Sequence, residues 1–251
     1  MKSIANYESM AKEIVNWTKE MVESYGTKDA IVIMNGDRDA AIVANILVKA
    51  LGEDHVIGLV MPYEPSMDCS RDKNLAREAG LKKIEEVNVT LATQAIEATA
   101  TIACKDSLLW LPSVEIISRA RFLVAQTLAS QLGAVVVSSM NLSDYYIGNF
   151  VLWGNLGVIA PLGKLTSTEV RVLGQALGLS EDICDISQYD DAYKQNAEAK
   201  MGLKYSDLDS YIRGGTDLAE GVKQAIEDRI ARNEYKGKLI NMPSFHPALV
   251  Q

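Results

Sequence analysis

The fold is decided by a stretch that begins Ala30-Ile31-Val32-Ile33-Met34 and continues Asn35-Gly36-Asp37-Arg38-Asp39. The five apolar residues predict a buried strand, and the five polar residues that follow predict a turn. Residues 40–51 are apolar nearly all round, which predicts a buried helix. A strand, a short turn and a helix in this order begin a β-α-β unit.

The same alternation extends outward on both sides of this unit. Residues 7–25 have apolar positions at helical spacing and predict an amphipathic opening helix. Further strands are predicted at 56–61, 83–89 and 134–137, and further helices at 70–79, 90–103 and 115–132, with a loop at 104–114. Strands alternating with helices indicate an α/β fold: a doubly wound parallel sheet with helices on both faces.

Beyond residue 142 the periodicity weakens. Thr166 and Glu169 form a capping-box pattern before a helix at 170–179. Helices are also predicted at 206–212 and at 217–232, the latter again opened by a capping-box pattern, whereas the polar stretch 186–200 predicts a mobile surface loop. Because no repeat or linker interrupts the chain, we expect residues 1–251 to form a single domain with a helical C-terminal part.

Composition excludes several classes of protein. The chain has 25 Lys and Arg against 33 Asp and Glu, a net charge of −8. A negative surface repels phosphate backbones, so we expect no nucleic-acid partner, although one small-molecule nucleotide is compatible with this charge. No apolar run reaches the roughly 20 residues that span a bilayer, so no membrane partner is expected. Three scattered cysteines and no secretory pattern at the start predict reduced thiols in the cytoplasm.

The turn after the first strand is the first candidate for a ligand site. In an open parallel sheet, ligands bind at the carboxyl ends of the strands. Unpaired backbone N–H groups and the helix dipole also favour an anion at this place. Two interpretations remain open here, because Asp39 also suits the N-cap of the helix. Asp37 adds a carboxylate where an anion would approach.

Five further segments occur in a recognisable order and spacing. They are Met61-Pro62 with a later Ser70, Glu115-Ile116-Ile117-Ser118-Arg119-Ala120-Arg121, Val136-Val137-Ser138-Ser139-Met140-Asn141-Leu142-Ser143-Asp144, Pro161-Leu162-Gly163-Lys164-Leu165-Thr166-Ser167-Thr168-Glu169-Val170 and Gly202-Leu203-Lys204-Tyr205-Ser206-Asp207-Leu208-Asp209. Together with the turn at 35–40, these segments resemble the ammonia-dependent NAD synthetases of the N-type ATP pyrophosphatase group. The resemblance covers most of the chain and implies an adenine nucleotide alpha-hydrolase-like fold.

The resemblance implies a reaction, its cofactors and a set of site residues. ATP adenylates the nicotinate carboxylate of deamido-NAD, and ammonia then displaces AMP to give NAD, with ATP and Mg²⁺ required and a homodimer expected. The implied ATP-binding residues are Asn35, Gly36, Asp37, Arg38, Asp39, Ala40, Met61, Arg119 and Ser139. The implied substrate-binding residues are Arg121, Trp153, Asn155 and Lys164, and the implied Mg²⁺ ligands are Asp39 and Asp144.

The sequence departs from the family pattern at the phosphate-binding positions. The family loop has Ser-Gly-Gly-x-Asp-Ser, whereas this chain has Asn35 and Ala40 at the two Ser positions and Asp37 at the second Gly. Ser167 stands where relatives have Lys. Residues 151–155 lack the family's Lys and Asp, and the late His-Lys-Arg reads Tyr235-Lys236-Gly237. Because these losses converge on the stabilisation of phosphate charge, we expect impaired or absent chemistry.

For four of the implied ATP- and substrate-binding residues, a purely structural role is an alternative to ligand binding. Arg119 and Arg121 lie two residues apart on a helix and therefore point to different faces. One suits a ligand phosphate while the other suits a carboxylate, and the alternative is that both are solvated. Lys164 is equally compatible with a surface lysine, and Trp153 with packing in a core or an interface.

Three hypotheses about function follow. The first is an active but divergent NAD synthetase. The second is a catalytically silent paralogue that binds a nucleotide or a protein partner. The third is an adenylating enzyme with an altered acid substrate. The conformation of residues 35–40 discriminates between them, since an open anion nest favours catalysis and Asp37 folded into the nest opposes it.

Overall fold

The sheet is parallel and has strand order β3-β2-β1-β4 in the computed structural model, which describes residues 3–154, 157–190, 192 and 194–237. In chain order its strands are β1 (Ala30–Met34), β2 (Val56–Val60), β3 (Lys83–Glu86) and β4 (Val135–Val137). β1 is central and pairs with β2 on one side and β4 on the other. The direction of winding therefore reverses between β1 and β4, which is where such sheets bind ligands.

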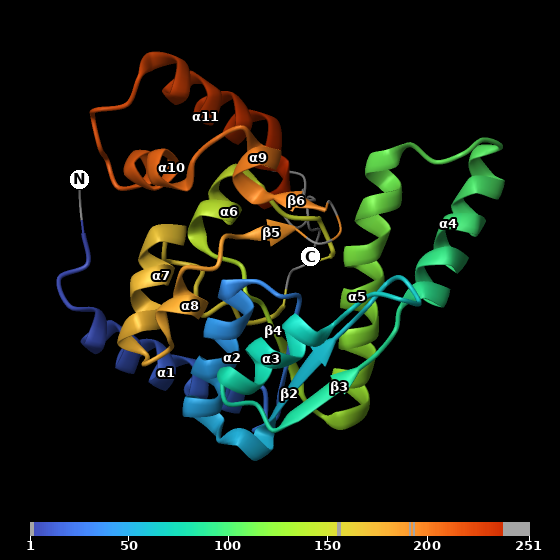
Figure 1. Cartoon of the computed structure of the whole chain (residues 1–251), viewed down its shortest axis with the longest axis horizontal. Coiled ribbons are helices and arrows are strands. Elements are labelled where there is room, and N and C mark those ends of the chain that lie inside the picture. The colour runs from blue at the N-terminus through green and yellow to red at the C-terminus, as the bar shows by residue number, and fades with distance from the viewer. Residues whose placement is uncertain (1–2, 155–156, 191, 193, 238–251) are drawn as a thin grey trace, which may run out of the picture.

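Alternate residues of the strands supply two separate cores. Ala30, Val32 and Met34 of β1 face one core. It also contains buried residues of α1 (Tyr7–Ser24), α2 (Arg38–Leu51), α3 (Ser70–Glu78), α7 (Ser167–Ala176) and α8 (Glu181–Cys184). Ile31 faces the other core, where Ala125 and Ala129 of α5 (Trp110–Leu132) pack against β4. Helices on both faces confirm the predicted doubly wound α/β fold (Figure 1).

A third core belongs to the C-terminal part. It is formed by Ile147, Leu208 and Ile226 with their neighbours. These residues come from α6 (Leu142–Ile147), α9 (Ala197–Met201), α10 (Tyr205–Ile212) and α11 (Glu220–Asn233), the last followed by the 3₁₀ turn η2 (Glu234–Gly237). Figure 1 shows α6, α9, α10 and α11 gathered at one end of the molecule.

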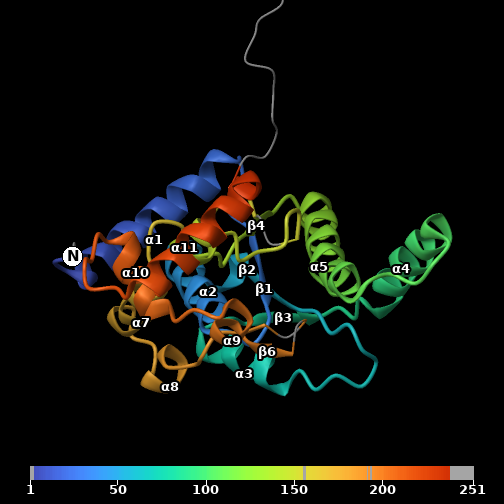
Figure 2. The same ribbon diagram turned by 90° about the horizontal axis from the view of Figure 1, so that it is seen from above.

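A pair of helices stands apart from the rest. Figure 2 shows α4 (Thr90–Cys104) projecting sideways next to α5. Their exposed apolar side chains include Leu91, Ile102, Leu109 and Trp110, with exposed fractions from 62% to 81%. This α4–α5 arm leaves an apolar surface uncovered in the single chain.

The predicted elements are confirmed with three corrections. The loop expected at 104–114 is wrong in its second half, because α5 begins at Trp110 and holds Pro112 in its first turn, where no backbone N–H is needed. The capping box expected at 217–220 is absent, since α11 begins at Glu220 with Ala219 as N-cap. The loop expected at 186–200 contains the short strands β5 (Tyr189–Asp190) and β6 (Gln195–Asn196) and the helix α9.

Candidate functional site

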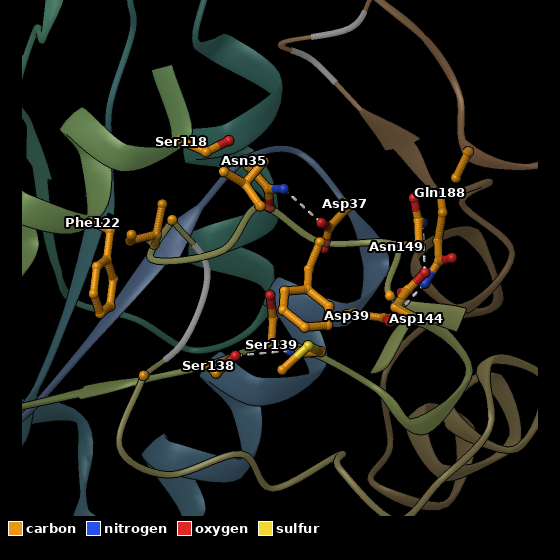
Figure 3. A pocket seen from close by; sticks show the side chains of 18 of the residues that line it. Asn35, Asp37, Asp39, Ser118, Phe122, Ser138, Ser139, Asp144, Asn149 and Gln188 are labelled. Carbon is orange, nitrogen blue, oxygen red and sulfur yellow. Dashed lines mark hydrogen bonds between the residues drawn. The ribbon is translucent and has the colours of Figure 1, made fainter. Parts of the chain in front are cut away.

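A cavity of about 360 Å³ lies at the carboxyl ends of β1 and β4. This volume is at the lower end of the range for small-molecule sites. Its lining comes from the β1–α2 turn, α5, the segment after β4, α6, α9, α11 and η2. Figure 3 shows Asn35, Asp37, Asp39 and Asp144 at this cavity, with Ser118 and Phe122 of α5 also on its lining.

Asp37 is the N-cap of α2. Its Oδ1 accepts a 2.7 Å hydrogen bond from the Ala40 N–H, and its Oδ2 accepts one of 2.6 Å from Asn35 Nδ2. Gly36 makes this turn possible, since its φ is +75° and an added Cβ would lie 2.6 Å from Asp72 Oδ1. The carboxylate of Asp37 therefore satisfies an N–H at the helix N-terminus that would otherwise serve a bound anion. The alternative of Asp39 as N-cap is wrong, because Asp37 holds that position.

Asp39 is surrounded by donors of the protein itself. Arg38 Nε donates to its Oδ1 at 2.9 Å, and both side chains are buried. Its Oδ2 accepts 2.7 Å bonds from Asn141 Nδ2 and from Gln188 Nε2. Arg38 also donates through Nη2 to the carbonyl and hydroxyl oxygens of Ser167 at 3.1 and 3.0 Å, which ties α2 to α7. Both oxygens of Asp39 are thus engaged within the chain.

Asp144, on α6, is engaged in the same way. Its Oδ1 accepts 2.7 Å bonds from Asn149 Nδ2 and from the Tyr205 hydroxyl. Its Oδ2 accepts a 2.9 Å bond from Asn141 Nδ2, so this one amide joins the carboxylates of Asp39 and Asp144. We call Asp37, Asp39 and Asp144 the acidic wall of the cavity.

Besides Arg121, three cationic side chains of the described residues line other parts of the cavity. Lys236 Nζ donates to the carbonyls of Gly148 and Phe150 at 2.8 Å each, and Arg229 donates through Nη1 to the Met201 carbonyl at 2.8 Å. Lys200 also lines the cavity. Burial lowers the pKa of both the Arg229 guanidinium and the Lys236 ammonium. We call Lys200, Arg229 and Lys236 the basic wall.

Burial also raises the pKa values of two carboxyl groups in the acidic wall. Loss of hydration raises the pKa of Asp37 to about 7, and the neighbouring Asp39 charge adds to this rise. Burial likewise raises the pKa of Asp144 to about 6. The folded chain therefore holds protons on these carboxyls at a pH where the unfolded chain has released them.

This difference predicts that Asp37 makes stability fall as pH rises. The stabilisation that the folded state gains by holding a proton on Asp37 is fully present below the unfolded pKa of about 3.9. It is lost as pH rises through the folded pKa near 7. Asp37→Asn removes this titration, while its carbonyl oxygen can still cap α2. We expect the stability advantage of the variant over the wild type to grow by about 1–3 kcal/mol between pH 5 and pH 8. Urea denaturation at both pH values measures it, and parallel curves for the two proteins would contradict it.

The structure brings together only part of the site implied by the sequence. Asn35, Asp37, Asp39, Ser139, Asp144 and Arg121 line the cavity. Gly36, Arg38 and Ala40 build the turn behind it. Arg121 donates to the Met61 carbonyl at 2.8 Å, and Met61 itself is buried in the core.

The other implied residues lie elsewhere or outside the described chain. Arg119 pairs with Glu115 at 2.7 Å and donates to the Leu152 carbonyl, whereas Arg121 lines the cavity, so the two arginines of α5 have different surroundings. Trp153 is 51% exposed and is not part of the cavity lining. Lys164 lines a different cavity, next to α1. Asn155 falls outside the described residues.

Several residues of the cavity had no signal of their own in the sequence. Gln188 belongs to a polar stretch without periodicity, and Arg229 and Lys200 are ordinary polar positions of helices. Tyr205 of the cavity, and Asn141, which donates to Asp39, lie within motif segments, and these segments were the only signal in the sequence for either residue.

The residues of the cavity do not fit Mg²⁺ or the phosphates of ATP in the way the resemblance implies. Mg²⁺ takes oxygen ligands at about 2.0–2.1 Å in a near-octahedral arrangement. Asp39 and Asp144 already accept amide, guanidinium and hydroxyl donors, with which a Mg²⁺ ion would have to compete for their oxygens. Among the described residues, no group of three or more His, Cys, Asp or Glu side chains is arranged to hold a metal ion. At the N-terminus of α2, the Asp37 carboxylate accepts the Ala40 N–H that a phosphate would need.

The chain matches one protein family over nearly all its length. The profile of the family described as NAD synthase matches residues 10–240. The NH3-dependent NAD+ synthetase of Carboxydothermus hydrogenoformans is 29% identical over 241 residues, which is 95% of this chain and 98% of that protein. The enzyme of the same description from Pyrococcus furiosus is 25% identical over 98% of both chains.

Solved structures share the fold. The NMN synthetase from Francisella tularensis superposes with a TM-score of 0.86 at 21% identity, over 96% of this chain and all of that chain. The NH3-dependent NAD synthetase from Campylobacter jejuni superposes with a TM-score of 0.78 at 17% identity, over 97% and 100%. These similarities confirm the adenine nucleotide alpha-hydrolase-like fold. Within the described residues, no helix combines the length and apolar character needed to cross a bilayer.

Proposed function

Because the chain belongs to the NAD synthase family, we propose that it is a nucleotide-binding member in which the ATP-dependent step of the family reaction is lost. The hypothesis rests on one observation: Asp37 Oδ1 caps α2 at 2.7 Å from the Ala40 N–H. The relatives are described as NH3-dependent NAD+ synthetases, and the family resemblance implies a reaction that begins by transferring AMP from ATP to a carboxylate. That step needs donors for the departing pyrophosphate at this turn.

The electrostatics of the turn oppose this step. A phosphate at the N-terminus of α2 would compete with the Asp37 carboxylate for the same N–H and would be repelled by its charge. Removing single charge-stabilising donors raises barriers by about 2.7–4 kcal/mol, and here a repelling charge is added as well. The positive charge of Arg38 does not offset this repulsion, because its guanidinium donates to Asp39 and Ser167.

The rest of the cavity supports ligand binding. It combines apolar lining from Phe122 and Val136 with polar groups from several elements, as small-molecule sites do. Its cationic side chains Arg229 and Lys236 are suited to a phosphate. These features favour a nucleotide ligand over a purely structural role.

The test is an assay of the purified chain with ATP, Mg²⁺, deamido-NAD and ammonia. We expect no NAD or AMP above background. The NH3-dependent enzyme from Carboxydothermus hydrogenoformans, run in parallel, verifies the assay. Turnover by this chain would overturn the proposal and favour an active NAD synthetase. Pyrophosphate release with another acid would instead favour an altered substrate.

We also propose that the chain forms a homodimer through the α4–α5 arm. A dimer buries the exposed apolar side chains of this arm, among them Leu109, Trp110 and Leu123. We expect light scattering at micromolar concentration to give twice the mass of the chain. Trp110→Glu together with Leu123→Glu is expected to shift the mass to that of one chain, because burying two charges opposes association. A monomeric wild-type chain would contradict the prediction.

A further inference from the structure

Among the described residues, neither Arg229 nor Lys236 of the basic wall forms a salt bridge with a carboxylate, although the charge of Glu115 acts to raise the pKa of Lys236. No carboxylate among the described residues contacts the Arg229 guanidinium, and its Nε is a buried donor without an acceptor. Within the described part of the chain, Lys236 donates to two backbone carbonyls and lies over the Phe150 ring. A partly buried cation that forms no salt bridge loses hydration without full compensation, so an anion of a ligand would stabilise this wall. Both side chains line the cavity, which places this anion inside it.

The acidic wall contains hydrogen-bond acceptors that need donors from a ligand. Asn35 Oδ1 and Gln188 Oε1 are buried acceptors that no donor of the described residues contacts, and both residues line the cavity beside Asp37 and Asp39. A ligand group facing this wall is favoured if it donates hydrogen bonds. A second carboxylate or a phosphate there would add a like charge to Asp37, Asp39 and Asp144.

We propose that the cavity binds a mononucleotide-sized ligand whose phosphate contacts Arg229 and Lys236 and whose hydrogen-bond-donating group, such as a carboxamide, faces Asp37 and Asn35. The corresponding carboxylate ligand is discriminated against. This inference rests on the proposed nucleotide-binding function and assigns its ligand class. It places the anion at α11 and η2 instead of at the N-terminus of α2.

Nicotinamide mononucleotide and nicotinic acid mononucleotide form a matched pair of probes, because they differ only in a carboxamide and a carboxylate. In calorimetric titrations at pH 8 without metal, we expect the carboxamide form to bind at least about tenfold more tightly. Asp37→Asn should bring the two affinities closer together, since it removes the nearest repelling charge. Inorganic phosphate alone should compete with both probes.

The basic wall is tested with Lys236→Met and Arg229→Met. Each variant is expected to lower the affinity for both mononucleotides by a similar factor of about ten and to leave the ratio of the two affinities unchanged. Lys223→Met is the matched control, because Lys223 is exposed on the same helix α11 and pairs with Glu227. Thermal unfolding of each variant verifies that it is folded, and Arg229→Lys provides a milder second variant at that position.

Three outcomes would overturn the inference. One is binding of the carboxylate probe as tightly as the carboxamide, the second is no binding of either, and the third is unchanged affinity in both basic-wall variants. Each outcome is independent of the ATP assay. A chain that fails to use ATP but prefers the carboxylate retains the proposed loss of catalysis and refutes only the ligand class.

Discussion

The triple variant Asn35→Ser, Asp37→Gly, Ala40→Ser is expected to bind ATP at least about 100-fold more tightly than the wild-type chain. Glycine at position 37 removes the carboxylate that accepts the Ala40 N–H at 2.7 Å and frees this donor for a phosphate. A like charge about 4 Å away costs roughly 4 kcal/mol at an effective dielectric constant of 20, and a 100-fold gain corresponds to about 2.7 kcal/mol of that. Calorimetric titration with ATP and Mg²⁺ measures the change.

Two controls isolate the cause of this gain. Asp37→Asn removes only the charge and retains a side-chain oxygen for the cap, so we expect a smaller gain. Asp182→Asn removes a charge from the exposed surface of α8 (Glu181–Cys184), away from the cavity, and is expected to have little effect. If the triple variant binds ATP no better than the wild type, Asp37 is not what excludes the phosphate.

Arg38→Met is expected to lower the free energy of unfolding by about 3–5 kcal/mol. The variant removes the guanidinium that pairs with Asp39 and joins α2 to Ser167, and it leaves a buried carboxylate without its cation. Because methionine replaces the unbranched arginine chain as far as Nε, much of the packing of the stem is kept and the lost guanidinium dominates the effect. Urea denaturation monitored by circular dichroism measures the difference.

An exposed ion pair provides the matched comparison. Arg171 pairs with Asp185 at 2.5 Å, and both side chains are about half exposed. Arg171→Met is therefore expected to leave stability nearly unchanged, since solvent screens such pairs. Equal effects of the two substitutions would contradict the assigned role of Arg38 as the internal counter-ion of the site.

The sequence predicted the fold well because short apolar strands alternate with amphipathic or buried helices along it. Strands such as Ala30–Met34 are continuous apolar runs, and only a sheet covered on both faces buries all of their side chains. The capping box of Thr166 and Glu169 was also predicted correctly, because both of its residues lie within one helical turn. Where local signals were weak, as at Trp110 and Ala219, the boundaries were wrong, since packing decides where such helices begin.

The sequence by itself determined the sheet, the position of the turn after β1 and the presence of Asp37 within it. The tertiary structure decided what that residue does. Only the folded chain places Asn141 and Gln188, more than 100 residues from Asp39, within 2.7 Å of its carboxylate. It also turns Arg38 inward to Ser167 and brings Arg229 and Lys236 to the same cavity. The physical reason is that periodicity reports which face of an element is buried, whereas charge compensation at a buried site depends on side chains that only long-range packing brings together.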